Sequence, residues 1–526
     1  MDSSRSRPCG TPRHPLFRIG EIASGAFFLL GLSTPSPGQE DEPRPVETVR
    51  LERAGTLITR SCRVEVPAAP IADSGNGVLR IVADGVTVEL AGEPLQGAPG
   101  GTDPDRFQGV GIVIAARDVT LRNARVRGFR TGIHALAAHG LVLEDCDVSG
   151  NYRQRLRSTQ AAEEKEDWLE PHANDGHEWF QRYGAGIYVE RSSAVTVARC
   201  RARAGQNGLI LERVERARVH DNDFSFLSGW GIALWRSCDN VIARNACDFC
   251  IRGYSHGVYN RGQDSAGILL FEQCSRNVIA ENSATHCGDG LFAFAGQEAL
   301  GASKSLPAGF DHARAGCNDN TIAGNDFSYA AAHGIEITFS FGNRLLSNRL
   351  VENSICGVWA GYSRETLIAA NEIVANGRAG YGLERGGIDI EHGQRNVIQG
   401  NVFRSNACGV HLWWDEDAGL AALPWTAANG HEARGEIVAG NRFESDDLGI
   451  QLRATSDVVT FENRFVDVAK QIDATPGAEP REKRYEPVAF ELPRDLPGET
   501  RPVGARTELR GRDKIRIEEW GPVEPR

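Results

Sequence analysis

Four side chains suited to acid–base chemistry occupy equivalent places in short apolar runs of the second half of the chain. They are Glu336, Asp389, Glu391 and His411. Three of them directly follow a pair formed by Gly and an aliphatic residue, and Glu391 stands two residues after Asp389 in the same run. In an extended run, successive side chains point to opposite faces. Because aliphatic residues alternate with these four, the pattern predicts that their side chains face away from the core.

The expected spacing of the carboxyl groups suits glycan hydrolysis. If successive runs stack as neighbouring strands, Glu336 and Asp389 stand two strands apart, or roughly 9 to 10 Å. Asp389 and Glu391 stand two residues apart on one strand, or about 6.7 Å. Both separations are close to those of inverting glycosidases, in which a water fits between the acid and the base. His411 would stack on Asp389 from the next strand, where a carboxylate orients or protonates it.

Aromatic residues gather around these four residues in the same runs. Their flat apolar rings suit the faces of sugar rings, and aromatics flanked by carboxylates are typical of a polysaccharide cleft. Asp264 would extend such a cleft toward the amino end, and His392 adjoins Glu391. The expected substrate-binding residues are Trp235, Asp264, Phe292, Phe294, Trp359, His392, Trp413 and Trp414. The alternative is that these aromatics only cover a loop.

An acidic triplet, Asp415-Glu416-Asp417, follows Trp414. Hard cations such as Ca²⁺ prefer several carboxylate oxygens, but the triplet lacks the spacing of a defined calcium loop. A solvated acidic turn is therefore the expected reading, with Ca²⁺ as the alternative. We assign no metal ligands and expect no cofactor.

A recurring hexapeptide indicates the elements that position these residues. It begins and ends with Asn, and its closing Asn recurs every 22 or 23 residues where no insertion intervenes. A Gly-Ile pair precedes most copies by about a dozen residues. Two short strands per repeat without a helix between them describe one coil of a solenoid. The clearest copies span 240–245, 277–282, 320–325, 343–348 and 396–401.

The closing Asn has two expected roles. Asn tolerates left-handed backbone geometry, which suits a sharp turn. Stacked coil on coil, its amide can also bond the Asn above and below, as in an amide ladder. Cys146 and Cys200 occupy this position at two rungs. We therefore expect most of the twelve cysteines to be buried thiols, and the Cys247-x-x-Cys250 pair to be structural.

The pattern over residues 75–468 resembles the right-handed parallel β-helix superfamily, which includes pectate lyases, polygalacturonases and alginate-modifying enzymes. The resemblance implies an all-β, single-stranded right-handed parallel β-helix solenoid of about 12 to 13 coils with loop insertions. It does not identify the chemistry, because one fold hosts many functions. The sequence has no Gly-His-Gly, and its adjacent Asp pair, Asp446-Asp447, opens one of the last coils. No catalytic residues of these enzymes can therefore be carried over.

Four regions are expected along the chain. Residues 1–39 form a signal peptide and leader, because basic residues precede an apolar run at 22–32 and a small polar segment. Residues 40–74 form an amino-terminal cap, 75–468 the β-helix and 469–526 a Pro- and charge-rich tail running back along the rod. The protein is expected to be secreted or periplasmic. No other segment is long and apolar enough to span a membrane.

A long insertion at 151–183 interrupts the repeat and carries Trp and His residues. Loops on a rigid scaffold often carry function. The insertion is therefore expected either to fold over a ligand or to cover the side of the rod, and the sequence does not decide between the two.

The formal net charge of -12 argues against binding to nucleic acid. The leading hypothesis is a secreted polysaccharide-active enzyme, a glycoside hydrolase that uses the paired carboxylates on a polysaccharide or oligosaccharide. One alternative is a polysaccharide lyase that acts on uronate polymers. The other is a non-catalytic carbohydrate-binding or periplasmic scaffold protein. The sequence does not fix the oligomeric state.

Overall fold

The computed structural model describes residues 47–159, 161–169, 173–253, 262–302, 309–379, 384–499, 506 and 508–525. The expected signal peptide and leader, residues 1–39, lie outside the described residues. None of the helices in the described part of the chain is long and apolar enough to cross a membrane.

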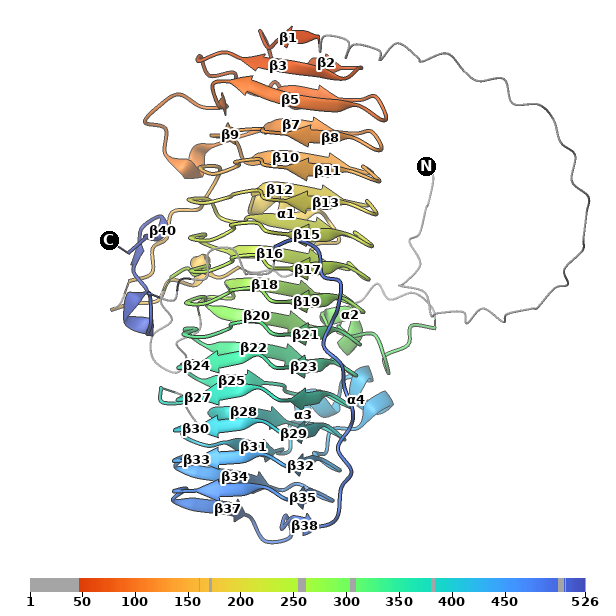
Figure 1. Ribbon diagram of the computed structural model, residues 1–526, viewed down its shortest axis with the longest axis vertical. Helices are drawn as coiled ribbons and strands as arrows, with labels where there is room; N and C mark the ends of the chain where they lie inside the picture. The colour runs from red at the N-terminus through yellow and green to blue at the C-terminus, as the bar shows by residue number, and fades with distance from the viewer. Residues whose placement is uncertain are drawn as a thin grey trace, which may run out of the picture.

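The described chain winds into a rod of stacked parallel strands (Figure 1), and the predicted right-handed parallel β-helix is confirmed. Two long sheets of 16 and 15 strands run the length of the rod, and a third sheet of 5 strands joins them in the carboxyl-terminal half. The stack has more rungs than the 12 or 13 expected. Strands continue past the expected limits of 75 and 468, from β1 near residue 48 to β38 near residue 482.

The sixteen-stranded sheet contains, in spatial order, β1 (Thr48–Arg50), β3 (Cys62–Val66), β5 (Thr87–Gly92), β8 (Thr120–Arg122), β11 (Val142–Glu144), β13 (Thr196–Ala198), β15 (Arg218–His220), β17 (Val241–Ala243), β19 (Val278–Ala280), β21 (Thr321–Ala323), β23 (Arg344–Leu346), β26 (Leu367–Ala369), β29 (Val397–Gln399), β32 (Ile437–Ala439), β35 (Val459–Phe461) and β38 (Arg481–Glu482). The fifteen-stranded sheet contains β2 (Thr56–Ile58), β4 (Leu79–Ile81), β7 (Val110–Ile114), β10 (Thr131–Leu136), β12 (Ala185–Glu190), β14 (Leu209–Glu212), β16 (Trp230–Trp235), β18 (Ala266–Phe271), β20 (Asp289–Phe294), β22 (His333–Thr338), β25 (Cys356–Trp359), β28 (Gly386–Glu391), β31 (Val410–Trp413), β34 (Leu448–Arg453) and β37 (Lys470–Ala474).

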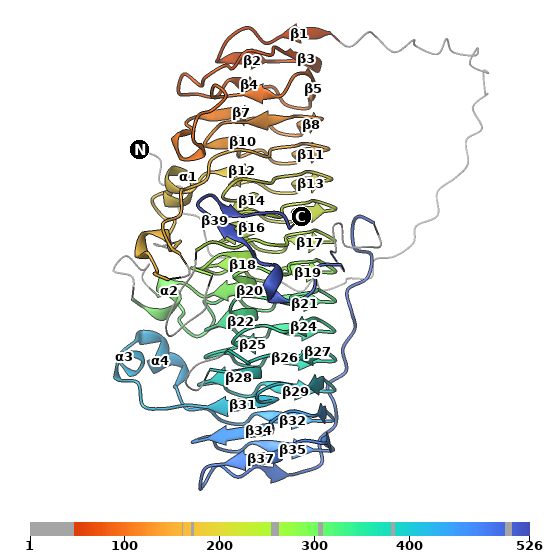
Figure 2. The ribbon, with the colours of Figure 1, turned by 90° about the vertical axis from the view of Figure 1, so that its left-hand side faces the viewer.

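The five-stranded sheet contains β24 (Arg349–Val351), β27 (Glu372–Val374), β30 (Val402–Arg404), β33 (Arg442–Glu444) and β36 (Arg464–Val466). Two small pairs are β6 (Leu95–Gln96) with β9 (Val126–Arg127), and β39 (Ile517–Glu518) with β40 (Gly521–Pro522). The helices are α1 (Glu178–Arg182), α2 (Gln297–Leu300), α3 (Ala418–Ala421) and α4 (Pro424–Asn429), with 3-10 turns η1 (Pro104–Arg106), η2 (Lys165–Asp167) and η3 (Arg512–Lys514). All four α-helices lie on the side of the fifteen-stranded sheet (Figure 2).

The alternation within each strand builds the core. Ile268, Leu291, Ile335, Val358 and Ile388 pair in register from β18 to β28, and all five are fully buried inside the coil. One coil cannot bury such a face alone, so each coil depends on its neighbours. The residues between these aliphatic positions therefore face outward, as the sequence predicts.

Close packing between coils explains why Gly occupies the first position of the Gly-Ile pair. A Cβ added to Gly290 would lie 2.5 Å from the carbonyl oxygen of Gly334 on the next coil and 2.7 Å from Cβ of Phe327. Only a residue without a side chain allows the coils to approach this closely.

The predicted amide ladder is confirmed. It runs from Asn222 to Asn463, with each amide donating to the next coil, as from Asn245 Nδ2 to Asn282 Oδ1 at 3.0 Å and from Asn282 Nδ2 to Asn325 Oδ1 at 2.9 Å. Most of its members are fully buried. Buried amides must be satisfied, and stacking identical residues satisfies them at every rung.

The expected turn role of the same Asn is wrong for the ladder residues. The left-handed residue is the one before: Arg244 has φ 56°, Glu281 φ 55° and Gly324 φ 66°. The ladder needs the Asn side chain turned inward, so the sharp reversal of the chain falls on its outward neighbour.

The cysteines behave as buried stacking residues. Ten described cysteines are free and buried, including Cys247 and Cys250. Cys146 and Cys200 stand at the rungs before Asn222, and the backbone N–H of Cys200 donates to Asn222 Oδ1 at 2.8 Å. The thiols therefore fill ladder positions in the core.

The insertion at 151–183 covers the side of the rod. Trp179 of α1 is fully buried and contacts Trp230, with ring centroids 4.5 Å apart. Leu169 and Tyr183 join the same apolar cluster over the outer face of β12 to β20. Of the two expected arrangements, the described residues of the insertion therefore show the second, in which the insertion covers the side of the rod.

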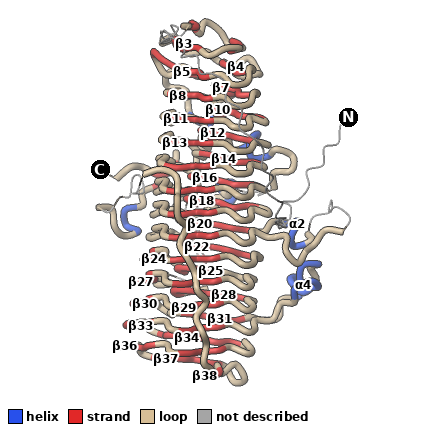
Figure 3. The backbone as a smooth tube through the Cα atoms, turned by 45° about the vertical axis from the view of Figure 1, so that its right-hand side comes forward, coloured by secondary structure: helices blue, strands red, loops and turns tan. Residues whose placement is uncertain are grey.

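The predicted return of the tail along the rod is confirmed (Figure 3). Val488 bonds Gln399 through its backbone N–H at 3.0 Å, and the backbone N–H of Glu499 donates to Asp221 at 2.9 Å, many coils nearer the amino end. Arg506 then pairs with the buried Asp248. The tail thus holds coils that are far apart in the sequence.

Candidate active site

The four predicted catalytic residues lie on the outer face of neighbouring strands. In register, Glu336 of β22 pairs with Trp359 of β25, Trp359 with Asp389 of β28, and Asp389 with His411 of β31. We call this row of outward positions the first column. Glu391 stands two residues beyond Asp389, in a second column. The sequence therefore placed all four side chains on the correct face and in the correct order.

Asp389 is fixed by two rings of the next coil. His411 Nδ1 donates to its Oδ2 at 2.8 Å, and Trp413 Nε1 donates to its Oδ1 at 2.9 Å. The predicted contact of His411 with Asp389 is thus confirmed. Both Asp389 and His411 are fully buried. In this conformation, Asp389 contacts no solvent, so its carboxylate acts on neighbouring side chains.

Glu391 is a carboxyl group whose pKa departs strongly from its ordinary value. Burial raises its pKa to about 8, with further contributions from the negative charges of Asp389, Glu384, Asp415 and Asp417. Its side chain keeps 13% of its surface exposed. Glu391 is therefore protonated at neutral pH and reachable from outside, as a general acid must be.

Glu336 lies two coils away in the first column and is 8% exposed. Its Oε2 lies 3.8 Å from Nε2 of the buried His333. The backbone N–H of His333 in turn donates to Asp289 at 2.9 Å. Glu336 thus lies on the same outer face as Glu391, two coils toward the amino end.

His392 lies next to Glu391 and beneath the surface. It is fully buried and stacks on Tyr362, with ring centroids 5.1 Å apart. Its Nδ1 hydrogen-bonds the carbonyl oxygen of His431. Its Nε2 lies 3.7 Å from Glu391 and 3.8 Å from Asp415. His392 therefore positions the insertion after β31 rather than offering a face to a sugar.

Three clusters among the described residues have side chains that could hold a metal ion, with candidate ligand atoms within 4.8 Å of one another. They are His177, Glu190 and Glu212; Asp289, His333 and Glu336; and Glu391, His392 and Asp415. Each mixes imidazole with carboxylate, a set that suits a transition metal better than Ca²⁺. Asp417 has a different task, because its side chain accepts from the backbone of Gly419 and Leu420 and caps α3.

The predicted aromatic residues divide by exposure. Trp359 and Trp413 are 9% and 7% exposed, and Trp359 stacks on His333. Trp414 is half-buried beside His431. These three border the carboxyl groups, so they remain candidates for contact with a ligand.

Three other aromatic residues predicted to bind a sugar are buried or partly buried by neighbouring side chains. Trp235 is fully buried between the guanidinium groups of Arg213 and Arg236, 4.5 and 4.3 Å from its ring centroid. It presents no face to a sugar in this structure, so we leave it out of the site. Phe292 and Phe294 pack against Phe271, with Phe292 7% exposed.

Asp264 is half-buried, and its backbone carbonyl accepts a hydrogen bond from Trp230 Nε1 at 2.9 Å. It therefore lies with the cluster under the 151–183 insertion, on the amino-terminal side of Glu336 and Glu391.

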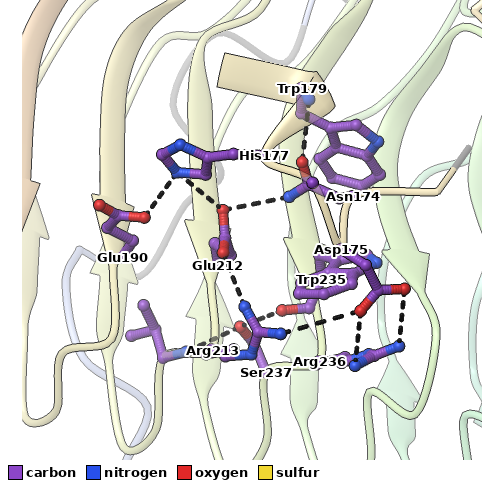
Figure 4. Close-up of polar contacts among 12 residues, drawn as sticks. Asn174, Asp175, His177, Trp179, Glu190, Glu212, Arg213, Trp235, Arg236 and Ser237 are labelled. Carbon is purple, nitrogen blue, oxygen red and sulfur yellow. Dashed lines mark hydrogen bonds and ion pairs between the residues drawn. The ribbon is translucent and has the colours of Figure 1, made fainter. Parts of the chain in front are cut away.

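One cluster that the sequence analysis did not select lies on the same outer face, nearer the amino end (Figure 4). His177, from the insertion, lies 2.6 Å from Glu190 and 3.4 Å from Glu212. His134 contacts the other oxygen of Glu190 at 3.2 Å, and Tyr188 donates to Glu212 at 2.5 Å. The alternation along β10, β12 and β14 turns His134, Tyr188, Glu190 and Glu212 outward, but only the fold brings His177 to them.

Electrostatics explain why this cluster holds together. Burial alone would raise the pKa of Glu190, but hydrogen bonds from His134 and His177 outweigh it and lower that pKa to about 2. The hydrogen bond to Glu190 raises the pKa of His177 above its ordinary value. The cluster therefore anchors the insertion through an ion pair.

We expect this anchor to weaken as the pH rises. A histidine whose pKa is raised by folding stabilises fully below its unfolded value, about 6.5, and the contribution is lost as pH rises through the folded value. The protection factors of the α1 amides, which correct for the intrinsic rise of hydrogen exchange with pH, should therefore fall above neutral pH. A His177→Gln variant should lose this pH dependence, and an unchanged dependence in that variant would contradict the assignment.

A family model described as "Right handed beta helix region" matches residues 74–246, 179–306 and 303–420. A comparison with curated proteins finds no match. Among solved structures, the chain is similar to the A-module of the mannuronan C-5 epimerase AlgE6 from Azotobacter vinelandii, at 14% identity and TM-score 0.39, covering 78% of this chain and 87% of that one.

It is also similar to the DFA-IIIase from Arthrobacter chlorophenolicus, at 12% identity and TM-score 0.36, covering 70% of this chain and 86% of that one. The Dettilon tailspike protein is similar at 14% identity and TM-score 0.37, covering 75% of this chain and 58% of that one. At such values, the likenesses carry no inference about chemistry.

Proposed function

The chain belongs to the right-handed β-helix family, and from the side chains on its outer face we propose that it is a secreted or periplasmic polysaccharide-active enzyme, a glycoside hydrolase. The observation that carries the proposal is Glu391: a carboxyl group with a pKa of about 8 that is still partly exposed. It stands on the face that also holds Glu336 two coils away and the indole rings of Trp359 and Trp413.

The proposed roles follow from these environments. Glu391 donates its proton to the glycosidic oxygen as that bond breaks. Glu336 takes a proton from a water that attacks the sugar carbon, so one molecule of water is added across the bond. The two residues stand diagonally across two coils, with backbones roughly 12 Å apart. Their side chains must lean toward each other to bring the carboxyl groups to the separation of about 6.5 to 9.5 Å at which a water fits between them.

Asp389 and His411 act as positioning residues in this scheme. Asp389 accepts hydrogen bonds from the rings of His411 and Trp413, and its negative charge contributes to the raised pKa of Glu391. When two carboxyl groups lie close together, the negative charge of one raises the pKa of the other. One group can then act as the acid while the other acts as the base.

The pH dependence of turnover tests the role of Glu391. A general acid works only while it is protonated, so kcat should fall as pH rises through about 8. The expected profile therefore has a descending limb near that pH. A limb at the pH typical of an exposed Glu, about 4.3, would contradict the assignment of the acid.

The reaction class is tested with a panel of neutral and uronate polysaccharides, with and without Ca²⁺. New reducing ends without the ultraviolet absorbance of unsaturated uronates would support hydrolysis. Both signals together would favour the alternative, a polysaccharide lyase. Binding without either signal would favour a carbohydrate-binding or scaffold protein.

A further inference from the structure

A cavity of about 330 Å³ lies beside the carboxyl-group site, between the turns of the coils and the insertion that follows β31. Its lining includes Arg314, Arg364, Arg395 and Arg434, with Glu365 as the carboxylate among the lining residues. Such a concentration of cations is unusual on a chain whose net charge is -12. A concave site lined by one sign of charge attracts ligands of the opposite sign.

The arginines of the cavity stack on successive coils. Arg364, Gln394 and Arg434 pair as one ladder of bridges from coil to coil. Gln394 follows Glu391 by three residues on the same coil, so the cavity begins where the strand that carries Glu391 ends.

Arg364 is the buried member, only 4% exposed. It donates to Gln394 Oε1, and to the carbonyl oxygen of Gly430 at 3.0 Å, and it lies over the ring of Trp425 at 5.1 Å. Among the described residues, its Nε–H has no acceptor. Neutral oxygens thus hold a buried positive charge, which is costly without an anion.

The other arginines are only partly neutralised. Arg395 contacts Glu365 at 2.9 Å, whereas Arg314 contacts Asp319 at 2.9 Å and Glu365 at 3.9 Å. Arg434 is exposed, with no carboxylate partner within ion-pair distance in the described part of the chain. The lining therefore keeps a positive excess that Glu365 alone does not cancel.

We propose that this cavity binds an oxyanion, either a carboxylate or a sulfate group, through Arg364, Arg395 and Arg434. The planar guanidinium fork matches both groups and donates in pairs. The existence of this site does not depend on the proposed function. Its use to hold an anionic group of a glycan beside Glu391 does rest on that function.

The test measures binding to the full chain by isothermal titration calorimetry, with sodium sulfate and with trigalacturonate as probes and a neutral glucose trisaccharide as the reference. We expect saturable binding of an anionic probe. Tighter binding of trigalacturonate would assign the site to carboxylates, and tighter binding of sulfate would assign it to sulfate groups.

Arg434→Gln should weaken this binding by roughly tenfold or more, because a charged hydrogen bond is lost. The matched control is Arg464→Gln, an exposed arginine of β36 outside the cavity, which should bind as the wild type does. Arg364→Lys keeps the charge and removes the fork, so it should weaken binding while retaining the fold.

The proposal is overturned if neither anion binds saturably, or if Arg434→Gln and Arg464→Gln bind equally well. Because Arg434 is exposed, its variant tests the site even if Arg364→Lys fails to fold. Anion binding by a protein that cleaves no polysaccharide would leave this site standing and remove the proposed function. Cleavage of a polysaccharide without anion binding would refute the anion site and leave the proposed function standing.

Discussion

Glu391→Gln should lower kcat on the preferred polysaccharide by about 10² to 10⁴, the contribution of a general acid. The substitution keeps the shape of the side chain and removes its proton at neutral pH. It also removes a group whose charged form is disfavoured by burial and by Asp389. The fold should therefore be retained, and steady-state kinetics would report the chemical loss alone.

Glu436→Gln is the matched control for this prediction. Glu436 is also a buried carboxyl group with a pKa raised to about 8, and burial is the main cause. Its oxygens accept from the backbone and side chain of Asn396, at 2.8 and 3.2 Å, inside the coil. A Gln there should leave kcat near the wild-type value. Equal losses in both variants would mean that a raised pKa alone does not mark the acid.

The second large effect concerns the amide ladder. Asn282→Ala should lower the free energy of unfolding by roughly 3 to 5 kcal/mol, because buried partners lose their hydrogen bonds. The Asn282 amide donates to Ile242 O and to Asn325 Oδ1, each at 2.9 Å, and its Oδ1 accepts from the backbone N–H and side chain of Asn245. Denaturant unfolding followed by circular dichroism measures the loss.

Asn123→Ala provides the comparison, since Asn123 is exposed and its amide donates to Glu89 at 3.1 Å. Because Asn123 has a left-handed φ of 56°, Ala there should cost about 1 to 2 kcal/mol, well below the loss expected at Asn282. If the two variants lost equal stability, the ladder would not be the main source of the cost at Asn282.

The repeat alone predicts most of the fold. Asn245, Asn282 and Asn325 recur in phase, and the period-two runs around Ile268 and Leu291 dictate which side chains enter the coil. Local periodicity suffices because every coil contacts only its neighbours. The same reasoning placed Asp389 and Glu391 on the outer face.

What periodicity cannot predict is which outer positions the insertions cover. Trp235 occupies an outward position, as does Trp359, yet the chain at 151–183 and two arginines bury the first. His177 reaches Glu190 only because the insertion folds back across several coils. Each contact with the insertion joins a residue of the repeat to a residue outside it, so the spacing of the repeat does not predict the contact.

The position of the left-handed turn is a second feature that the sequence predicted wrongly. After Gly, Asn is the residue type that most readily adopts that conformation, but beside the ladder the conformation falls on Arg244 or Glu281 instead. The free energy of satisfying a buried amide outweighs the local backbone preference of one residue.

The most direct test of the central proposal is the mass of the products formed from a defined oligosaccharide of the preferred substrate, by the wild type and by Glu391→Gln. We predict that each cleavage by the wild type adds the elements of one water, and that the variant forms such products far more slowly. Products that lack those elements, or cleavage by Glu391→Gln at the wild-type rate, would contradict hydrolysis by acid catalysis at Glu391.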